Sequence, residues 1–323
     1  MRIISTLVYS AALILLTSNY RVTAQIEVDN SLPVNSNAIK NGINFKINGG
    51  TMRGKNLFHS FKRFNIPNGG EAFFDNADSV ENIFTRVTGN SISNIDGMLK
   101  TNGSANLFLM NPNGIIFGKN ARLDIGGSFI STTADNINFA DGTFFNSLNL
   151  QEKPLLTISV PTGLQFGKNT QAITINSQSQ LEVKSGNTLA LIAGNINIKG
   201  GILKSPEGNI SLGSVNTGIV NIDSLSLNSD FDFDYKKIAV FKDIDLQQTL
   251  IDSSGFGHGS IKLQGRNIIV NNGSQILIKN FGFQPTGNIQ INASESLQVS
   301  GISSDNTVNS SLINETFGKG IGG

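Results

Sequence analysis

The sequence predicts an all-β fold, and within that class a parallel β-helix that carries a β cap at its N-terminal end. Short runs of alternating apolar and polar residues follow one another from Ile92 onward, separated by Gly, Asn, Asp or Ser. Windows typical of helices are almost absent after Gln25. A five-residue pattern recurs at 194–198 (GNINI), 208–212 (GNISL), 259–263 (GSIKL) and 287–291 (GNIQI). Copies at imperfect intervals, the shorter of which fall within about 14 to 29 residues, indicate stacked solenoid rungs, because a β-sandwich produces no internal repeat.

The energetics of stacking explain why such a fold requires a long chain. One rung of about 20 residues buries about five to seven apolar side chains, each contributing about 1.5–3 kcal/mol, whereas ordering the backbone costs about 1–2 kcal/mol per residue. Stacked rungs share buried faces, and Asn at repeated corners can add ladders of side-chain amides. Because the exposed end of a stack invites aggregation, we expect residues 25–87, where Phe is dense, to form a cap.

The chain begins with a segment typical of a signal peptide, residues 1–24. Arg2 supplies a positive charge, and residues 3–16 form a mostly apolar run that is too short to span a bilayer. Small residues at 22–24 offer a cleavage site before Gln25. A retained anchor, the alternative, requires a longer apolar run. The sequence therefore predicts an exported protein that is not integral to a membrane.

The composition excludes several classes of partner. Charged residues make up 15% of the 323 residues and the net charge is +1, which gives no electrostatic basis for binding nucleic acid or an anionic membrane surface. The basic pairs at 62–63 and 236–237 are interpreted as solvated positions. There is no Cys, so stability must come from burial and hydrogen-bonded ladders. Passage of an unfolded chain through a narrow pore is one hypothesis for the lack of Cys, and chance is the other.

Residues 25–150 are expected to form one unit, which contains the cap and the first regular rungs. Residues 43–47 alternate apolar with polar side chains and precede two glycines, which indicates a half-buried strand. Residues 80–87 carry apolar side chains at helical spacing, but their β-branched content favours a strand.

The most informative stretch, residues 101–118, contains a sharp corner between two strands. Residues 107–110 alternate Leu with Phe and Met, so this strand is apolar on both faces and must be covered on both. The order Asn, Pro, Asn, Gly at 111–114 is typical of a type I turn, in which Pro fixes φ and the Asn side chain bonds the local backbone. We expect this corner to join the cap to the regular stack.

Residues 151–323 are expected to continue the stack with further rungs. An irregular excursion is predicted near 222–254, where the acidic and aromatic run 231–235 interrupts the rhythm. The final residues, 318–323, form another Gly-rich turn and no capping element. We therefore expect the chain to be the N-terminal part of a longer protein.

Four segments carry a family resemblance: 56–61 (NLFHSF), 82–89 (NIFTRVTG), 93–97 (SNIDG) and 102–118 (NGSANLFLMNPNGIIFG). They resemble the filamentous haemagglutinin family, and more narrowly the N-terminal secretion domain of two-partner secretion exoproteins. The resemblance is densest over 49–142 and covers most of the mature chain. It implies a right-handed, single-stranded parallel β-helix with an N-terminal β cap.

The resemblance also implies a partner, a dedicated outer-membrane β-barrel transporter whose periplasmic domains bind the exoprotein unfolded. In the family the NPNGI motif contributes to secretion, and it maps onto Asn111, Pro112, Asn113, Gly114 and Ile115. A second family motif, NPNL, has no counterpart in this chain. By this resemblance the chain is the secretion-signal domain of a surface adhesin or haemagglutinin that meets ligands on host or neighbouring cells. A turn required only for folding is the alternative role of the motif.

The sequence shows no constellation typical of a catalytic or metal site. There are two His, of which His59 lies in an apolar strand and His258 in the Gly-rich turn 255–259, and they share no metal-ligand spacing. That turn lacks the Lys and Ser or Thr of a phosphate loop. We predict no cofactor.

The most serious competing class is a carbohydrate-active β-helix enzyme, which needs carboxylates that converge on one face. Asp230, Asp232 and Asp234 alternate along an extended run and so can share a face, where a cation is conceivable. The Phe and Tyr neighbours of these residues favour a solvated strand face. A third class is the N-terminal part of a contact-dependent toxin with its activity after Gly323. We predict a secretion domain that is not an enzyme.

Overall fold

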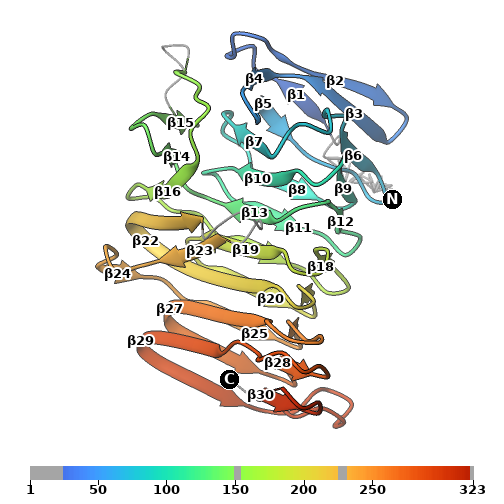
Figure 1. The fold of residues 1–323 in the computed structure, drawn as a ribbon, viewed down its shortest axis with the longest axis vertical. Coiled ribbons are helices and arrows are strands. Elements are labelled where there is room, and N and C mark those ends of the chain that lie inside the picture. The colour runs from blue at the N-terminus through green and yellow to red at the C-terminus, as the bar shows by residue number, and fades with distance from the viewer. Residues whose placement is uncertain (1–24, 149–153, 225–230, 321–323) are drawn as a thin grey trace, which may run out of the picture.

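The computed structural model describes residues 25–148, 154–224 and 231–320, and in these ranges it contains strands but no helix. The predicted signal peptide, residues 1–24, lies outside the described residues. The strands stack along one long axis, from the blue N-terminal strands to the red C-terminal strands of Figure 1. The prediction of an all-β fold is confirmed.

Three parallel ladders form the faces of the column. The first ladder comprises β5 (Asn56–Phe64), β7 (Asn82–Val87), β10 (Asn106–Met110), β13 (Phe129–Thr132), β19 (Thr188–Ala193), β22 (Asn209–Ser224), β27 (Ser260–Asn271) and β29 (Ile289–Ser300). The second comprises β8 (Ser93–Ile95), β11 (Ile115–Phe117), β17 (Ile173–Ile175), β20 (Ile196–Lys199) and β25 (Ile244–Gln247), and it continues into the later halves of β27 and β29. The third comprises β3 (Asn44–Gly49), β6 (Glu71–Phe74), β9 (Met98–Thr101), β12 (Arg122–Asp124), β18 (Gln180–Glu182), β21 (Ile202–Lys204), β26 (Leu250–Asp252), β28 (Gln275–Asn280) and β30 (Ser311–Thr316). Since successive rungs pair in parallel, the predicted parallel β-helix is confirmed.

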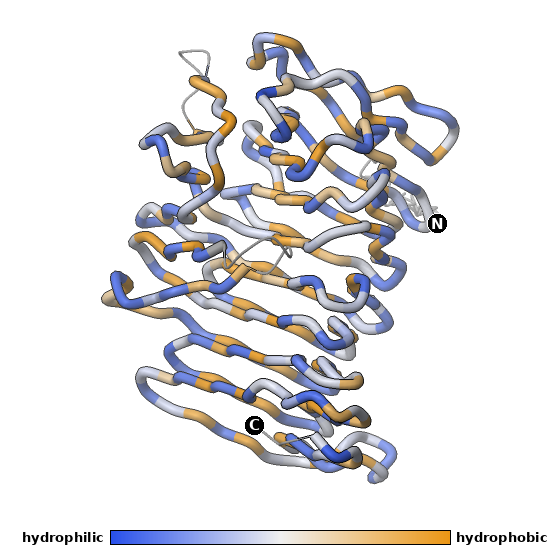
Figure 2. The backbone as a smooth tube through the Cα atoms, in the orientation of Figure 1, coloured by the Kyte–Doolittle hydropathy of each residue, from blue (hydrophilic) through white to orange (hydrophobic). Residues whose placement is uncertain are grey.

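Side chains of the first ladder face two apolar cores, one inside the column and one outside it. Apolar and polar residues alternate along the rungs in Figure 2. On β10, Leu107 and Leu109 point into the column and join the main core. Phe108 and Met110 point outward and join a second core on the outer face of the ladder. All of these side chains are fully buried, which confirms that residues 107–110 are covered on both faces.

Antiparallel strands outside the column cover the second core. β14 (Asn136–Phe139) pairs with β15 (Phe144–Asn146) and with β16 (Pro161–Phe166), and β16 pairs with the later part of β22. β23 (Phe231–Asp234) and β24 (Val240–Phe241) also pair with β22 in antiparallel fashion. β23 and β24 lie within the excursion predicted near 222–254, and the ladders resume at β25. Residues 149–153, between β15 and β16, lie outside the described ranges.

The antiparallel strands of the N-terminal cap are β1 (Ile26–Val28), β2 (Ser36–Asn41) and β4 (Thr51–Arg53). The parallel ladders begin nearer the N-terminus than expected, since β5 pairs in parallel with β7 from its first residue, Asn56. The corner at 111–114 follows β5, β7 and β10 and therefore lies inside the stack. The expectation that it joins the cap to the stack is wrong, and the domain division near residue 150 stays a prediction.

A ladder of side-chain amides runs along the starts of three stacked strands. The Asn82 Nδ2 donates to the Asn56 Oδ1 at 3.1 Å, and the Asn106 Nδ2 donates to the Asn82 Oδ1 at 3.0 Å. The Asn56 amide in turn donates to the carbonyls of Thr157 and Ser159 at 3.1 and 2.9 Å. The predicted Asn ladder is confirmed, and it also holds the segment before β16 against the top of the stack.

Candidate functional site

The corner at residues 111–114 joins β10 to β11 and has the geometry of a type I turn. The Gly114 amide donates to the Asn111 carbonyl at 3.1 Å, which is the hydrogen bond that closes such a turn. The φ angle of Asn113 is not positive, and this distinguishes type I from type II. The Asn113 amide also donates to the Asn111 Oδ1 at 3.0 Å. The predicted local role of Asn111 is confirmed.

The Asn111 side chain is fully buried, and both its Nδ2 and its Oδ1 are hydrogen-bonded. Its Nδ2 donates to the Ser91 carbonyl at 3.0 Å and to the Ser93 Oγ at 2.9 Å, both on the preceding rung. The Asn113 Nδ2 reaches the same rung and donates to the Gly89 carbonyl at 2.7 Å. The two amides therefore fasten this corner onto the corner of the preceding rung.

The following rung closes the corner from the other side. The Asn111 amide donates to the Thr132 carbonyl at 3.0 Å, and the Ile115 amide donates to the Ala172 carbonyl at 3.2 Å. Gly114 has φ +110°, and a Cβ there would lie 3.2 Å from the Ala172 oxygen. The backbone angle therefore favours glycine at this position, and a Cβ would also crowd the next rung.

The folded motif exposes little surface. Asn111, Pro112, Gly114 and Ile115 are buried, and Asn113 is half-buried. The outer edge of the turn borders a groove of about 440 Å³, which is lined by Asn90, Ile92, Pro112, Asn113, Asp135, Leu148, Lys168, Asn169 and Gln171. Only the edges of the Pro and of the second Asn face this groove, so the folded protein presents a small part of the motif to a partner.

The predicted acidic face on β23 is an ion-paired surface. Asp232 and Asp234 alternate with the buried Phe231 and Phe233, so the two carboxylates share the outer face as expected. The Lys262 Nζ lies 3.0 Å from Asp232, and Lys236 lies 3.6 Å from Asp234. Asp230 lies outside the described residues. Within the described ranges no three His, Cys, Asp or Glu side chains are arranged to hold a metal ion.

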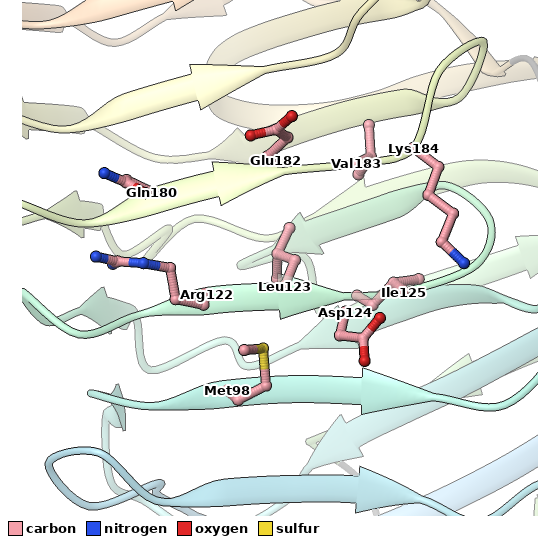
Figure 3. A pocket seen from close by; sticks show the side chains of 9 residues that line it. All are labelled: Met98, Arg122, Leu123, Asp124, Ile125, Gln180, Glu182, Val183 and Lys184. Carbon is pink, nitrogen blue, oxygen red and sulfur yellow. The ribbon is translucent and has the colours of Figure 1, made fainter.

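A groove on the third ladder carries charged residues but no converging pair of carboxylates. β12 and β18 share a single register pair, and the groove opens beside it with a volume of about 330 Å³. Figure 3 shows the carboxylates of Asp124 and Glu182 on different strands and pointing in different directions. Asp124 also pairs with Lys100 at 2.7 Å. This arrangement differs from the facing carboxyl groups of glycosidases.

The two histidines occupy unlike environments. His59 is buried in β5, where its Nδ1 lies 3.0 Å from the Ser36 Oγ, and its ring packs on Phe61 and Phe74. His258 is exposed in the turn 255–259 and has φ +65°. The contacts of His59 are those of a structural residue.

The burial of His59 makes stability depend on pH. Burial lowers the pKa of this imidazole from 6.5 to about 3, so below pH 6.5 the unfolded chain binds a proton that the folded chain does not. We expect the free energy of unfolding to fall by about 2 kcal/mol between pH 7 and pH 5. Urea unfolding at both pH values checks this. His59→Gln should remove most of the loss and His258→Asn should retain it, whereas equal losses in both variants would refute the assignment.

A buried polar network that the sequence does not predict ties the cap to the stack. Arg86 on β7 is 1% exposed, and its Nε and Nη2 donate to the hydroxyls of Ser60 and Ser31 at 2.8 Å each. Its Nη1 donates to the Asn146 carbonyl. The same two hydroxyls donate to the carboxylate of Asp29, at 2.6 Å from Ser60 and 2.7 Å from Ser31. Two serines thus bridge a buried cation and an anion.

The pKa values reflect this enclosure. Burial lowers the pKa of Arg86 to about 10, although Asp29 counteracts the shift. Burial raises the pKa of Asp29, but hydrogen bonds from Ser60, Thr88 and Ser31 outweigh it and hold that pKa below its usual value. An Arg in a run of apolar and β-branched residues, within NIFTRVTG, is the only sequence signal for this network.

Comparisons with known proteins identify the family. The family model of the TPS secretion domain matches residues 24–263. The crystal structure of the HMW1 secretion domain from Haemophilus influenzae is 21% identical and has a TM-score of 0.51, with 86% of this chain and 74% of that chain covered. The crystal structure of the filamentous hemagglutinin secretion domain is 14% identical and has a TM-score of 0.43, with 86% and 98% covered. No curated protein matches this chain.

The family match agrees with the resemblance, and the likeness to the HMW1 secretion domain agrees with the fold. The matched family is one of secretion domains rather than enzymes. The described residues include no helix with the length and apolar character that crossing a membrane requires. The chain belongs to the TPS secretion domain family, the secretion domains of two-partner secretion exoproteins.

Proposed function

We propose that this chain directs an adhesin or haemagglutinin to a dedicated outer-membrane β-barrel transporter, whose periplasmic domains read Asn111, Pro112, Asn113, Gly114 and Ile115 in the unfolded chain. Membership of the TPS secretion domain family supports the transporter as partner. Signal-peptide features at residues 1–24 support export to the compartment where those periplasmic domains lie. The chain then folds outside the cell, where the exoprotein meets ligands on host or neighbouring cells.

The observation that carries this proposal is the burial of the motif after folding. Both amide hydrogens of Asn111 are used by the preceding rung, and its backbone amide is used by the following rung. A transporter domain that contacts these groups must therefore do so before the rungs close. Recognition and folding compete for the same hydrogen-bonding groups, so folding itself ends the recognition.

Folding outside the cell would also favour movement of the chain outward over movement back into the periplasm. Each added rung buries apolar side chains against the rung before it, and this burial favours the folded stack. The chain contains no Cys, so no disulfide must form or open during passage.

Alanine substitution at the motif separates recognition from folding. Asn111→Ala is expected to lower the free energy of unfolding by about 1–3 kcal/mol and to reduce secretion strongly, because it removes a buried hydrogen-bonding group and part of the recognised segment. Secreted protein is measured in cells that contain the transporter, and stability is measured on refolded protein. Pro112→Ala tests the neighbouring position.

Asn280→Ala is the matched control, because Asn280 is also buried, accepts from the Gly282 amide at 2.9 Å and donates to the Gln284 carbonyl at 2.8 Å. It should lower stability similarly and leave secretion nearly unchanged. If both motif variants are secreted normally, or if secretion follows stability equally at Asn111 and Asn280, the recognition role is wrong.

A further inference from the structure

The rung that follows the motif has an insertion at the matching corner. Between β10 and β11 the chain turns through residues 111–114, and between β19 and β20 it turns through residues 194–195. Between β13 and β17 the chain instead leaves the column after Thr132 and returns at Ile173. β14, β15 and β16 lie in this insertion, which emerges from the rung that follows the motif.

The insertion is clamped where it leaves and re-enters the column. The Thr133 Oγ1 donates to the Gln171 carbonyl at 2.9 Å and accepts from the Gly194 amide at 3.2 Å. The Gly194 amide also lies 2.8 Å from the Gln171 carbonyl. Thr133 is 1% exposed. We call Thr133 and Gln171, together with their neighbours Thr132 and Ala172, the neck of the insertion.

The neck is also the part of the next rung that covers the motif. Thr132 accepts from the Asn111 amide and Ala172 accepts from the Ile115 amide. Asp135, Lys168 and Asn169, which lie just beyond the neck, line the groove beside Pro112 and Asn113. The residues that cover the motif therefore belong to the neck itself.

We infer that the neck regulates access to residues 111–115, and this inference rests on the proposed function. If the N-terminal end of the chain leaves the transporter first, β10 and β11 can form on the preceding rung before the neck is complete. The motif then remains open on one side until Ala172 folds onto Ile115. This side stays closed only once the Gly194 amide bonds to the Thr133 hydroxyl. The neck thus sets the point in export at which the transporter loses its contact.

Native-state hydrogen exchange at the Ile115 amide tests the closure without any transporter. Thr133→Val removes both hydrogen bonds of the hydroxyl at nearly constant volume, and the Ile115 amide should exchange about tenfold faster than in the unmodified chain. Thr249→Val is the matched control, because the buried Thr249 hydroxyl also makes two bonds, to the carbonyls of Ile198 and Gln247. It should leave exchange at Ile115 unchanged. Unchanged exchange in Thr133→Val, or equal acceleration in both variants, overturns the inference.

A binding measurement then separates this inference from the proposed function. The folded Thr133→Val chain should be captured by immobilised periplasmic domains of the transporter about tenfold more than the folded Thr249→Val chain. A peptide of residues 101–118 serves as the positive probe. If the peptide binds and the two folded variants are captured equally, the neck does not control access. If the peptide does not bind, the proposed recognition fails, while the exchange result still decides whether the neck closes over the motif.

Discussion

The Arg86→Met variant is expected to lose about 3–5 kcal/mol of its free energy of unfolding. Met retains much of the side-chain volume but removes the buried cation that faces Asp29 through Ser31 and Ser60. The half-buried carboxylate then remains without its counter-charge, and the bridging hydroxyls lose a donor. The guanidinium also lies 4.5 Å from the centre of the Phe145 ring, and that contact is lost as well. Urea unfolding at pH 7 measures the change.

Two further variants show whether the effect comes from the buried network. Combining Asp29→Asn with Arg86→Met should cost less than the sum of the single changes, because neither charge is then left alone. Arg266→Met is the surface control, since Arg266 pairs with Asp243 at 2.6 Å but both side chains remain partly exposed. That change should cost about 1 kcal/mol or less. A loss in Arg86→Met no larger than in Arg266→Met would contradict the role given to the network.

The Phe84→Ala variant is expected to lose about 3–5 kcal/mol, because Phe84 lies at the centre of the second core. Its ring centre is 5.2 Å from that of Phe58, 4.8 Å from that of Phe108 and 5.2 Å from that of Phe139. The first two rings belong to neighbouring rungs, and Phe139 belongs to the covering strand β14. Loss of the central ring therefore weakens both the stack and its cover. Thermal and urea unfolding check this expectation.

An exposed aromatic pair provides the control for that prediction. Phe281 and Phe317 also stack on neighbouring rungs, with ring centres 5.5 Å apart, but Phe281 is 51% exposed. Phe281→Ala should cost about 1 kcal/mol, because little surface is withdrawn from water there. Equal losses at the two positions would mean that the second core adds no stability beyond ring stacking.

The fold was predictable because its signals are local and repeat from rung to rung. Alternation of apolar and polar residues marks the strands, and the Gly-Asn copies at 194–195 and 208–209 mark where strands begin. The double-sided burial of residues 107–110 followed from their side chains alone. The type I turn at 111–114 followed from the conformational preferences of Asn, Pro and Gly.

The remaining features depend on contacts between residues that are far apart in the sequence. The outward face of β10 required a cover, but which strands provide it is decided by antiparallel pairing of β14 with β16 and of β16 with β22. Arg86 resembled a polar interruption of a strand until Asp29 and the two serines enclosed it. The expected cap extended too far because its dense Phe residues belong partly to the second core.

The motif illustrates the same division between local and long-range information. Its local bonds were predictable from the residues at 111–114, whereas its burial depends on the preceding and the following rung. The preceding rung contributes Ser91 and Ser93, and the following rung contributes Thr132 and Ala172. The sequence could therefore single out residues 111–115, but only the fold shows that these residues are hidden once the rungs close.

Binding of the chain to the periplasmic domains of its transporter, before and after folding, tests the central claim most directly. The full chain, diluted rapidly from urea onto immobilised domains, should bind at first, and the captured fraction should fall at the rate at which the chain folds. Chain that is folded before mixing should show little binding, and Asn111→Ala should weaken binding of the freshly diluted chain. Folded chain that binds as tightly as freshly diluted chain would contradict the claim that recognition precedes folding.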